Sequence, residues 1–109
     1  MIKKLYAIRD LRSNYFLDIQ MYREDSEALR VFGHVVCNVS DSFIYAYPED
    51  YDLVHIGMYD DEDGVVEPIQ HIKIANGNDL VHLRKRYGKK EDDINVKETV
   101  LVNSEESLQ

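Results

Sequence analysis

The residues best placed to do chemistry in this chain form a basic run after Leu83 that reads R-K-R-Y-G-K-K. Lysine and arginine neutralise phosphates and release their counterions, and a neighbouring aromatic ring can stack on an unpaired base. The run therefore predicts contact with nucleic acid, although a solvated, charged tail would have the same composition. The residues with this expected role are Arg84, Lys85, Arg86, Tyr87, Lys89 and Lys90.

Bases near the start of the chain could extend this surface. They are Lys3, Lys4, Arg9 and Arg12. The chain also has eight tyrosines and no tryptophan. Tyrosine on a solvated sheet face can serve as a stacking platform for bases. However, Tyr6, Tyr15 and Tyr22 suit core and cross-strand positions equally well.

Patterns for catalysis, metal binding or cofactor binding are missing from the sequence. The acidic stretch Asp60–Asp63 suggests a calcium loop, but aligning Gly64 with the loop glycine puts Tyr59 at the first ligand position and Gln70 at the glutamate. The four histidines form no H-x-x-x-H pair, and no serine has a G-x-S-x-G context. We therefore predict a protein that is not an enzyme and that holds no metal or cofactor.

Composition narrows the class of protein further. The 109 residues predict one domain, and the net charge of −8 argues against binding nucleic acid or an anionic membrane by bulk charge. The single cysteine, Cys37, has no disulfide partner and is expected to be a buried apolar residue. No apolar run approaches the ~18 residues of a membrane span. No signal-peptide core follows the start, so we expect a reducing cytoplasm and no membrane partner.

Charge is segregated along the chain. From Asp41 to Glu67 there are nine acids and no Lys or Arg, whereas Arg84–Lys90 has five bases and no acid. The acidic stretch is expected either to point away from bound nucleic acid or to contact a basic protein.

Two antiparallel strands are expected at the start, over Lys3–Leu11 and Tyr15–Tyr22, joined by the polar turn Arg12–Asn14. The second strand alternates with a period of two, which predicts that its residues divide between two faces. One face would hold Tyr15, Leu17, Ile19 and Met21, and the other Phe16, Asp18, Gln20 and Tyr22.

A helix is expected to follow, with Asp25 or Ser26 as its N-cap and an end near Asn38. Its apolar stripe consists of Ala28, Leu29, Phe32, Val35 and Val36. Gly33 should weaken the helix by roughly 1 kcal/mol relative to alanine.

The rest of the chain is expected to hold a second hairpin. Ser42–Tyr47 could be an edge strand or a loop over the core. A turn at Pro48 leads into a strand over Leu53–Tyr59, and the Asp-Gly of residues 63–64 marks a hairpin tip. The return over Val65–Ala75 holds Pro68, so its early part is expected to be irregular or on an edge. His55 and His71 would then be neighbours on paired strands. A short helix over Asp79–Tyr87 follows the break at Asn76–Asn78.

These elements predict an α+β fold, a small antiparallel sheet of about four strands with one main helix packed on one face, in the order β-β-α-β-β. Residues 1–76 would form a single domain. Residues 77–109 would be a basic, then acidic C-terminal segment that is partly flexible.

Three segments together resemble the small nonstructural protein of gokushoviruses, the single-stranded-DNA phages of the microvirus group. They are K-L-Y-A-I-R-D-L at residues 4–11, A-L-R-V-F-G-H-V-V at 28–36 and Y-P-E-D-Y-D-L-V-H-I-G-M-Y-D-D-E-D-G at 47–64. The family's proline- and phenylalanine-rich piece after the first turn appears here as Y-F-L-D-I-Q-M-Y, which is a departure. Residues such as Arg9, Arg30, Phe32, Pro48 and Tyr51 transfer as fold markers, since the family has no catalytic residues to carry over.

The resemblance implies a DNA-binding protein that assists the switch from genome replication to single-strand synthesis and packaging in the host cytoplasm. Its partner would be single-stranded DNA, with phage replication or capsid proteins as further candidates. The alternative is an acidic interaction adaptor that docks on a basic phage or host protein without nucleic-acid contact. Edge strands could also pair two copies into a homodimer.

Overall fold

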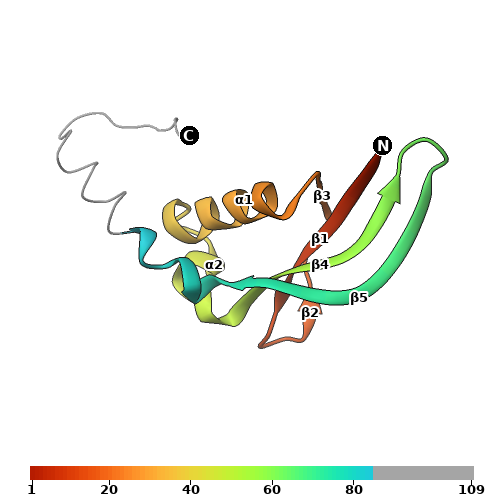
Figure 1. Ribbon diagram of the computed structural model, residues 1–109. Coiled ribbons are helices and arrows are strands. Elements are labelled where there is room, and N and C mark those ends of the chain that lie inside the picture. The colour runs from red at the N-terminus through yellow and green to blue at the C-terminus, as the bar shows by residue number, and fades with distance from the viewer. Residues whose placement is uncertain (85–109) are drawn as a thin grey trace, which may run out of the picture.

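The computed structural model describes residues 1–84 and contains a five-stranded antiparallel sheet with one main helix (Figure 1). The predicted α+β fold is therefore confirmed. The elements are β1 (Ile2–Asp10), β2 (Tyr15–Phe16), β3 (Gln20–Tyr22), α1 (Asp25–Asn38), α2 (Phe43–Ala46), the 3₁₀ turn η1 (Pro48–Asp50), β4 (Tyr51–Asp60), β5 (Val65–Asn76) and the 3₁₀ turn η2 (Gly77–Leu80). No helix of the described part is long and apolar enough to cross a membrane.

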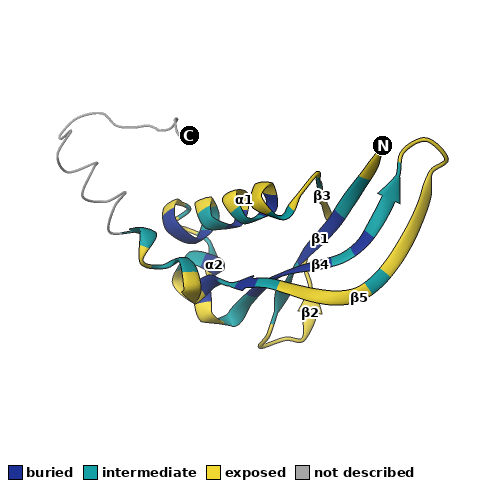
Figure 2. Cartoon of the chain, viewed as in Figure 1, coloured by how far each residue is buried: buried dark blue, intermediate teal, exposed yellow. Residues whose placement is uncertain are grey.

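The sheet is built around the neighbouring strands β1 and β4. Its order is β2-β1-β4-β5, and β3 also pairs with β1. The strand β5 lies at the edge, as its proline predicted, and most of its residues are exposed (Figure 2). The strands β1, β4 and β5 extend past the end of α1, so the β4–β5 hairpin forms an arm beyond the packed core (Figure 1).

The stretch Tyr15–Tyr22 is two short strands rather than the single strand that its alternation predicted. Arg9 pairs with Phe16 and Tyr6 pairs with Gln20, so two residues of β1 oppose the three residues 17–19. This extra residue is a bulge, and a bulge breaks the alternation of faces. Tyr15 and Met21 therefore do not share a face, which corrects the prediction.

The core lies between α1 and one face of the sheet. Tyr6 and Leu53 on the sheet pack with Ala28, Phe32 and Val36 on the helix, and all five are buried. The predicted helical stripe is thus confirmed, with Leu29 and Val35 packed at its margins. Cys37 is also buried in this cluster, and burial raises the pKa of its thiol.

The start of α1 is tied to the sheet rather than capped by its own side chains. The N-cap is Glu24, not the predicted Asp25 or Ser26, and it makes no side-chain capping bond. The carboxylate of Asp25 instead accepts a hydrogen bond from the Tyr6 hydroxyl, and Lys4 Nζ lies 3.6 Å from it. Because these partners occupy the carboxylate, Asp25 links the helix to β1.

The segment after α1 is helical, which corrects the prediction of a strand or loop at Ser42–Tyr47. The Ser42 hydroxyl accepts a hydrogen bond from the Tyr45 N–H at 3.0 Å, so Ser42 caps the one-turn helix α2. Ile44 of this helix is buried in the core.

The hairpin tip after β4 is confirmed. Gly64 has φ 76, a conformation that favours glycine, and its N–H donates to the Asp60 carbonyl at 2.8 Å. Asp60 and Asp63 each accept a backbone N–H within the turn, from Glu62 and Val65 respectively.

The packed part of the chain continues past the boundary predicted at Asn76. Asn76 and Asp79 form a reciprocal capping box around η2, so the turn begins two residues before the expected helix. Leu80, Val81 and Leu83 pack against the core cluster. Residues 77–84 therefore belong to the same folded unit, and the rest of the predicted helix at 85–87 lies outside the described residues.

Candidate nucleic-acid interface

The β1–β2 turn presents aromatic and basic side chains from a well-ordered backbone. Asp10 accepts the N–H groups of Arg12 and Ser13 at 3.0 and 3.3 Å, and Asn14 adopts φ 66. Desolvation alone would raise the pKa of Asp10, but these backbone hydrogen bonds hold it below its usual value. The Leu11 N–H donates to the Asp50 carbonyl, which fixes the turn to η1. The turn is thus fixed by hydrogen bonds within it and by a hydrogen bond to η1.

Arg9 and Phe16 form the centre of this site. They are direct cross-strand partners, and the Arg9 guanidinium lies 5.7 Å from the centre of the Phe16 ring. The same ring meets the His71 ring edge-on at 5.4 Å. Since β2 and β5 are the two ends of the sheet order, this contact shows that the sheet curves strongly at this point.

Exposed side chains surround the centre. Tyr15 is 74% exposed and Phe16 is 41% exposed, even though both are aromatic. The Arg12 side chain is 80% exposed, and its guanidinium lies 3.8 Å from the Asp50 carboxylate. We define the turn cluster as Arg9, Arg12, Tyr15, Phe16 and His71.

Of the two arginines in the turn cluster, Arg12 is ion-paired with Asp50, whereas Arg9 has no ion pair among the described residues. Its terminal nitrogen donates to the Asn14 side chain at 3.2 Å, and its buried Nε has no partner in the described part of the chain. Aromatic rings with adjoining cations can stack bases while following phosphates. The cluster therefore combines an aromatic ring for stacking with a neighbouring cation for a phosphate.

The two lysines at the other end of β1 lie away from the turn cluster. Lys3 Nζ lies 3.4 Å from Asp61, and Lys4 Nζ lies 3.6 Å from Asp25. Lys4 points to the helix side of the sheet, whereas Arg9 lies with Phe16 on the other side. The structure therefore does not unite the four predicted N-terminal basic residues: Arg9 lies beside Phe16 and Arg12 belongs to the same turn, whereas Lys3 and Lys4 pair with carboxylates elsewhere.

Arg84 has a packing role that the sequence did not reveal. Its Nε donates to the Val36 carbonyl at 2.9 Å, and a terminal nitrogen donates to the Tyr45 carbonyl. Its guanidinium lies over the Tyr45 ring, 3.7 Å from the centre. The predicted phosphate contact at Arg84 would compete with these bonds, since the carbonyls at the ends of α1 and α2 use its donors. Lys85, Arg86, Tyr87, Lys89 and Lys90 lie outside the described residues.

Sequence reasoning missed Phe16 and His71 as members of the cluster. The short turn after β1 could have indicated that Phe16 pairs with Arg9, because a hairpin fixes its register. No local signal could have placed His71, which comes from the far edge of the sheet. His55 and His71 lie on paired strands, as predicted, but the cross-strand partner of His55 is Ile72. His55 is buried and stacks on Tyr6 at 5.0 Å, whereas His71 meets Phe16.

Comparison with known proteins agrees with the sequence pattern at the level of a family. No curated protein and no solved structure matches the chain. Residues 3–80 match the family described as Phage ORF5 protein. The match runs from β1 to the end of η2 and thus spans most of the described fold. The chain therefore belongs to the Phage ORF5 protein family.

Proposed function

We propose that this phage protein binds single-stranded DNA through the turn cluster and assists the switch from genome replication to single-strand synthesis and packaging in the host cytoplasm. One observation carries the proposal: the exposed Phe16 ring lies beside the Arg9 guanidinium, on a turn that also exposes Tyr15 and Arg12. The resemblance to the gokushovirus nonstructural protein supports the biological role.

Single-stranded DNA suits this site better than a duplex. The turn cluster lies on a curved sheet, and α1, the one long helix described, packs on the core, so this region offers no free helix for a major groove. Unpaired bases expose their π faces to aromatic side chains, and stacking is worth about 1–3 kcal/mol per base. The proposed action is binding without catalysis. The lysine and arginine residues within 85–90 would add phosphate contacts.

The test compares matched pairs of variants for affinity to a fluorescein-labelled oligothymidylate, measured by anisotropy. Tyr15→Ala should weaken binding about tenfold, in line with the loss of one stacked base. Tyr47→Ala is its control, because Tyr47 is also exposed at 53% but lies at the end of α2. Arg12→Ala has Arg30→Ala as its control, since Arg30 is an exposed base on α1.

The proposal fails if the wild-type chain shows no affinity for the oligonucleotide at low salt. It also fails if the control variants lose as much affinity as Tyr15→Ala and Arg12→Ala do. A chain truncated after Asn78 is unsuitable for this test, because the truncation would remove Leu80, Leu83 and Arg84 from the core.

An acidic adaptor is the second candidate, and the β4–β5 arm favours it. Asp63 and Glu67 on this arm have no ion-pair partner within residues 1–84. A pull-down after nuclease treatment would distinguish the two functions. Recovery of the phage replication initiator or capsid proteins, lost on Asp63→Asn/Glu67→Gln substitution, would favour the adaptor.

A further inference from the structure

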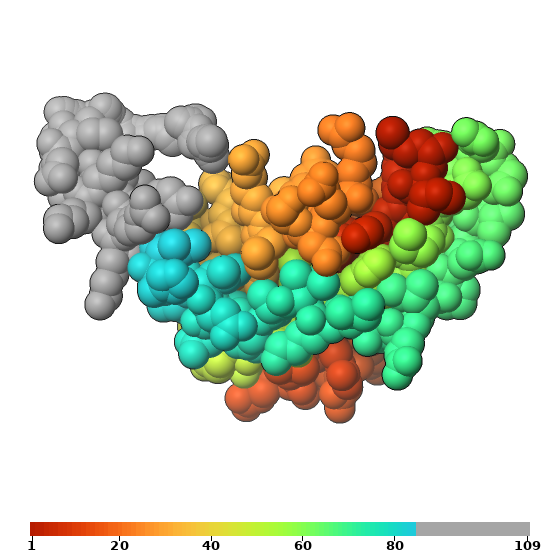
Figure 3. All heavy atoms as spheres, in the orientation of Figure 1, coloured from red at the N-terminus to blue at the C-terminus, as the bar shows by residue number. Residues whose placement is uncertain are grey.

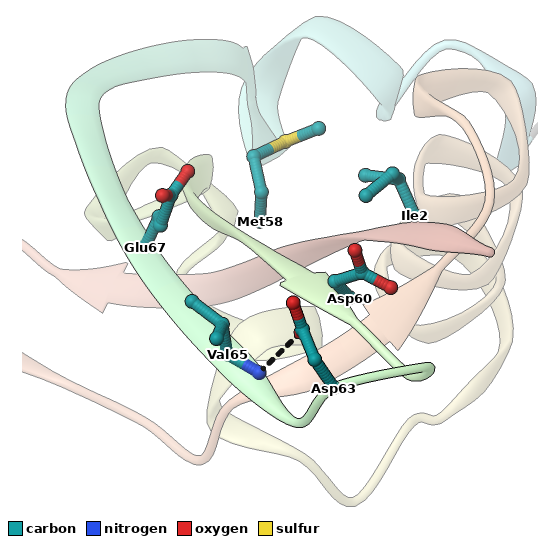
Figure 4. A pocket seen from close by; sticks show the side chains of 6 residues that line it. All are labelled: Ile2, Met58, Asp60, Asp63, Val65 and Glu67. Atoms are coloured by element: carbon teal, nitrogen blue, oxygen red, sulfur yellow. Dashed lines mark hydrogen bonds between the residues drawn. The ribbon is translucent and has the colours of Figure 1, made fainter.

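The β4–β5 arm carries a small hollow that the proposed DNA site does not use. It has a volume of about 110 Å³ and is lined by Ile2, Met58, Asp60, Asp63, Val65 and Glu67 (Figure 4). A small-molecule site usually measures about 300–1,000 Å³, so this hollow suits a single long side chain. Its apolar walls match an aliphatic stem, and its carboxylates match a cationic head.

Two carboxylates of the hollow, those of Asp63 and Glu67, remain available for a charged partner. Asp61 and Glu62 lie 2.7 and 3.5 Å from the amino group of Met1, and Asp61 also binds Lys3. In contrast, Asp63 and Glu67 have no ion-pair partner in the described part, and Asp60 is 4.0 Å from the Met1 amino group. No three metal-ligating side chains of residues 1–84 converge closely enough to hold a metal ion, which favours an organic cation.

The same chain supplies a matching cationic segment. Directly after Arg84 the sequence reads K-R-Y-G-K-K, residues 85–90. Arg84 itself is fixed by its bonds to Val36 and Tyr45, so the starting point of this segment is known. Opposite charges on two surfaces of one molecule make self-association favourable when the surfaces can meet.

The two surfaces lie at opposite ends of the molecule. The tip of the hairpin and the last described residues are at the two ends of the view in Figure 1 and in Figure 3. The strand β5 connects them with 12 residues, which corresponds to about 40 Å at 3.3 Å per residue. Lys90 is six residues beyond Arg84 and can lie at most about 20 Å from it. These lengths favour a second copy, rather than the same chain, as the source of the segment that fills the hollow.

We propose that the hollow on the β4–β5 arm of one copy binds the basic segment 85–90 of a second copy. Such a contact is heterologous, because it joins two different surfaces, and it propagates head to tail into rings or open chains. The contact needs no nucleic acid. Single-stranded DNA would compete with this contact, because its phosphates attract the same basic residues.

Analytical ultracentrifugation of the full chain without DNA tests this proposal. The wild-type protein should form species larger than a dimer as its concentration rises, and should return to a monomer when salt increases from about 0.05 M to about 0.5 M, because exposed charges are then screened. Asp63→Asn/Glu67→Gln should weaken association about tenfold. Asp41→Asn/Glu49→Gln changes the net charge equally at exposed acids outside the hollow and should leave association unchanged.

A charge-reversal pair makes the test specific. Asp63→Lys/Glu67→Lys and Lys89→Glu/Lys90→Glu should each be monomeric alone. Mixed together they should associate again, because each restores the complementary charge for the other. The proposal is overturned if the wild-type chain is a monomer at every concentration, if the control acids matter as much as those of the hollow, or if the mixture fails to associate.

Discussion

At the scale of residues, the arginines of this chain differ in the groups that their guanidinium contacts. Arg84 donates to two backbone carbonyls that terminate helices, whereas Arg12 projects into solvent beside one carboxylate. The sequence alone does not distinguish the two arginines. In the structure, Arg84 stabilises the fold, whereas Arg12 is accessible to a ligand. Surface ion pairs such as Arg12–Asp50 are worth only about 0–1 kcal/mol, so Arg12 can exchange its partner at small cost.

Arg84→Ala is expected to lower the free energy of unfolding by about 2 kcal/mol. The substitution leaves the Val36 and Tyr45 carbonyls without a charged donor, and hydrogen bonds to charged groups contribute about 1.5–3 kcal/mol. Arg84→Lys should recover part of the loss, since an ammonium lacks the fork that reaches both carbonyls. Urea unfolding followed by circular dichroism measures the difference. Equal stability of all three proteins would contradict a packing role for Arg84.

Because of Asp25, the free energy of unfolding should fall when the pH is lowered into the acid range. The Tyr6 hydrogen bond, and after it the charge of Lys4, hold the pKa of Asp25 below its ordinary value of 3.8, despite partial desolvation. Because the folded pKa is the lower one, the ionised carboxylate stabilises the fold at neutral pH, and this contribution is lost as the pH falls through the folded value.

Asp25→Asn should therefore be less stable than wild type at pH 7 and should lose less stability between about pH 5 and pH 2. Tyr6→Phe keeps the ring but removes the hydroxyl, so it should lower stability at pH 7 and shift the acid transition in the same direction. Urea titrations across this pH range test the expectation. An unchanged acid transition in both variants would show that the Tyr6–Asp25 contact does not stabilise the fold.

At the scale of elements, the turns η1 and η2 are packed closely together. A Cβ atom at Gly77 would lie 2.3 Å from the Pro48 carbonyl oxygen, so η2 and η1 approach each other through a position that only glycine fits. Gly33 in α1 differs, because a Cβ there would make an ordinary contact with Leu80 at 3.7 Å. Two glycines near the same junction thus have opposite requirements.

Gly77→Ala should destabilise the protein by about 1–3 kcal/mol, the usual cost of forcing atoms into a filled space. Gly33→Ala should stabilise it by up to about 1 kcal/mol, because alanine favours the helix and its methyl group would make an ordinary contact with Leu80. Thermal unfolding of the two variants and the wild type checks both the expected loss and the expected gain of stability. A neutral Gly77→Ala variant would mean that η1 and η2 separate readily.

At the scale of the whole molecule, charge is distributed unevenly along one long axis. The hairpin arm carries the acids Asp60–Asp63 and Glu67, and the described chain leaves the other end at Arg84, directly before the basic sequence that ends at Lys90. The net charge of −8 opposes binding to DNA in general, so any affinity must come from local groups and must depend strongly on salt.

Salt titration can separate stacking from phosphate contact. Each phosphate neutralised on a single strand contributes about −0.7 to the slope of log Kobs against log salt. Lys89→Ala/Lys90→Ala should therefore make the slope shallower by about 1.4, whereas Tyr15→Ala should lower affinity and leave the slope unchanged. If Lys89→Ala/Lys90→Ala leaves the slope unchanged, these lysines do not contact phosphate.

The sequence by itself determined the elements that depend on local chemistry. An apolar centre predicted β1, an apolar helical stripe predicted α1, and branched and aromatic residues predicted β4. The Asp-Gly pair predicted the hairpin tip, and Pro68 favoured an edge strand, because each depends on backbone preferences. The segments at 4–11, 28–36 and 47–64 also carried the likeness to a phage family, and the match over residues 3–80 agrees at that level.

Only the tertiary structure decided which side chains meet. The bulge at residues 17–19 reversed the faces after Phe16, and the curvature of the sheet brought His71 across to that ring. Arg84 found its carbonyls on helices about 40 residues earlier in the chain. Such contacts depend on long-range packing, in which one extra residue redirects every side chain that follows, and no local pattern records it.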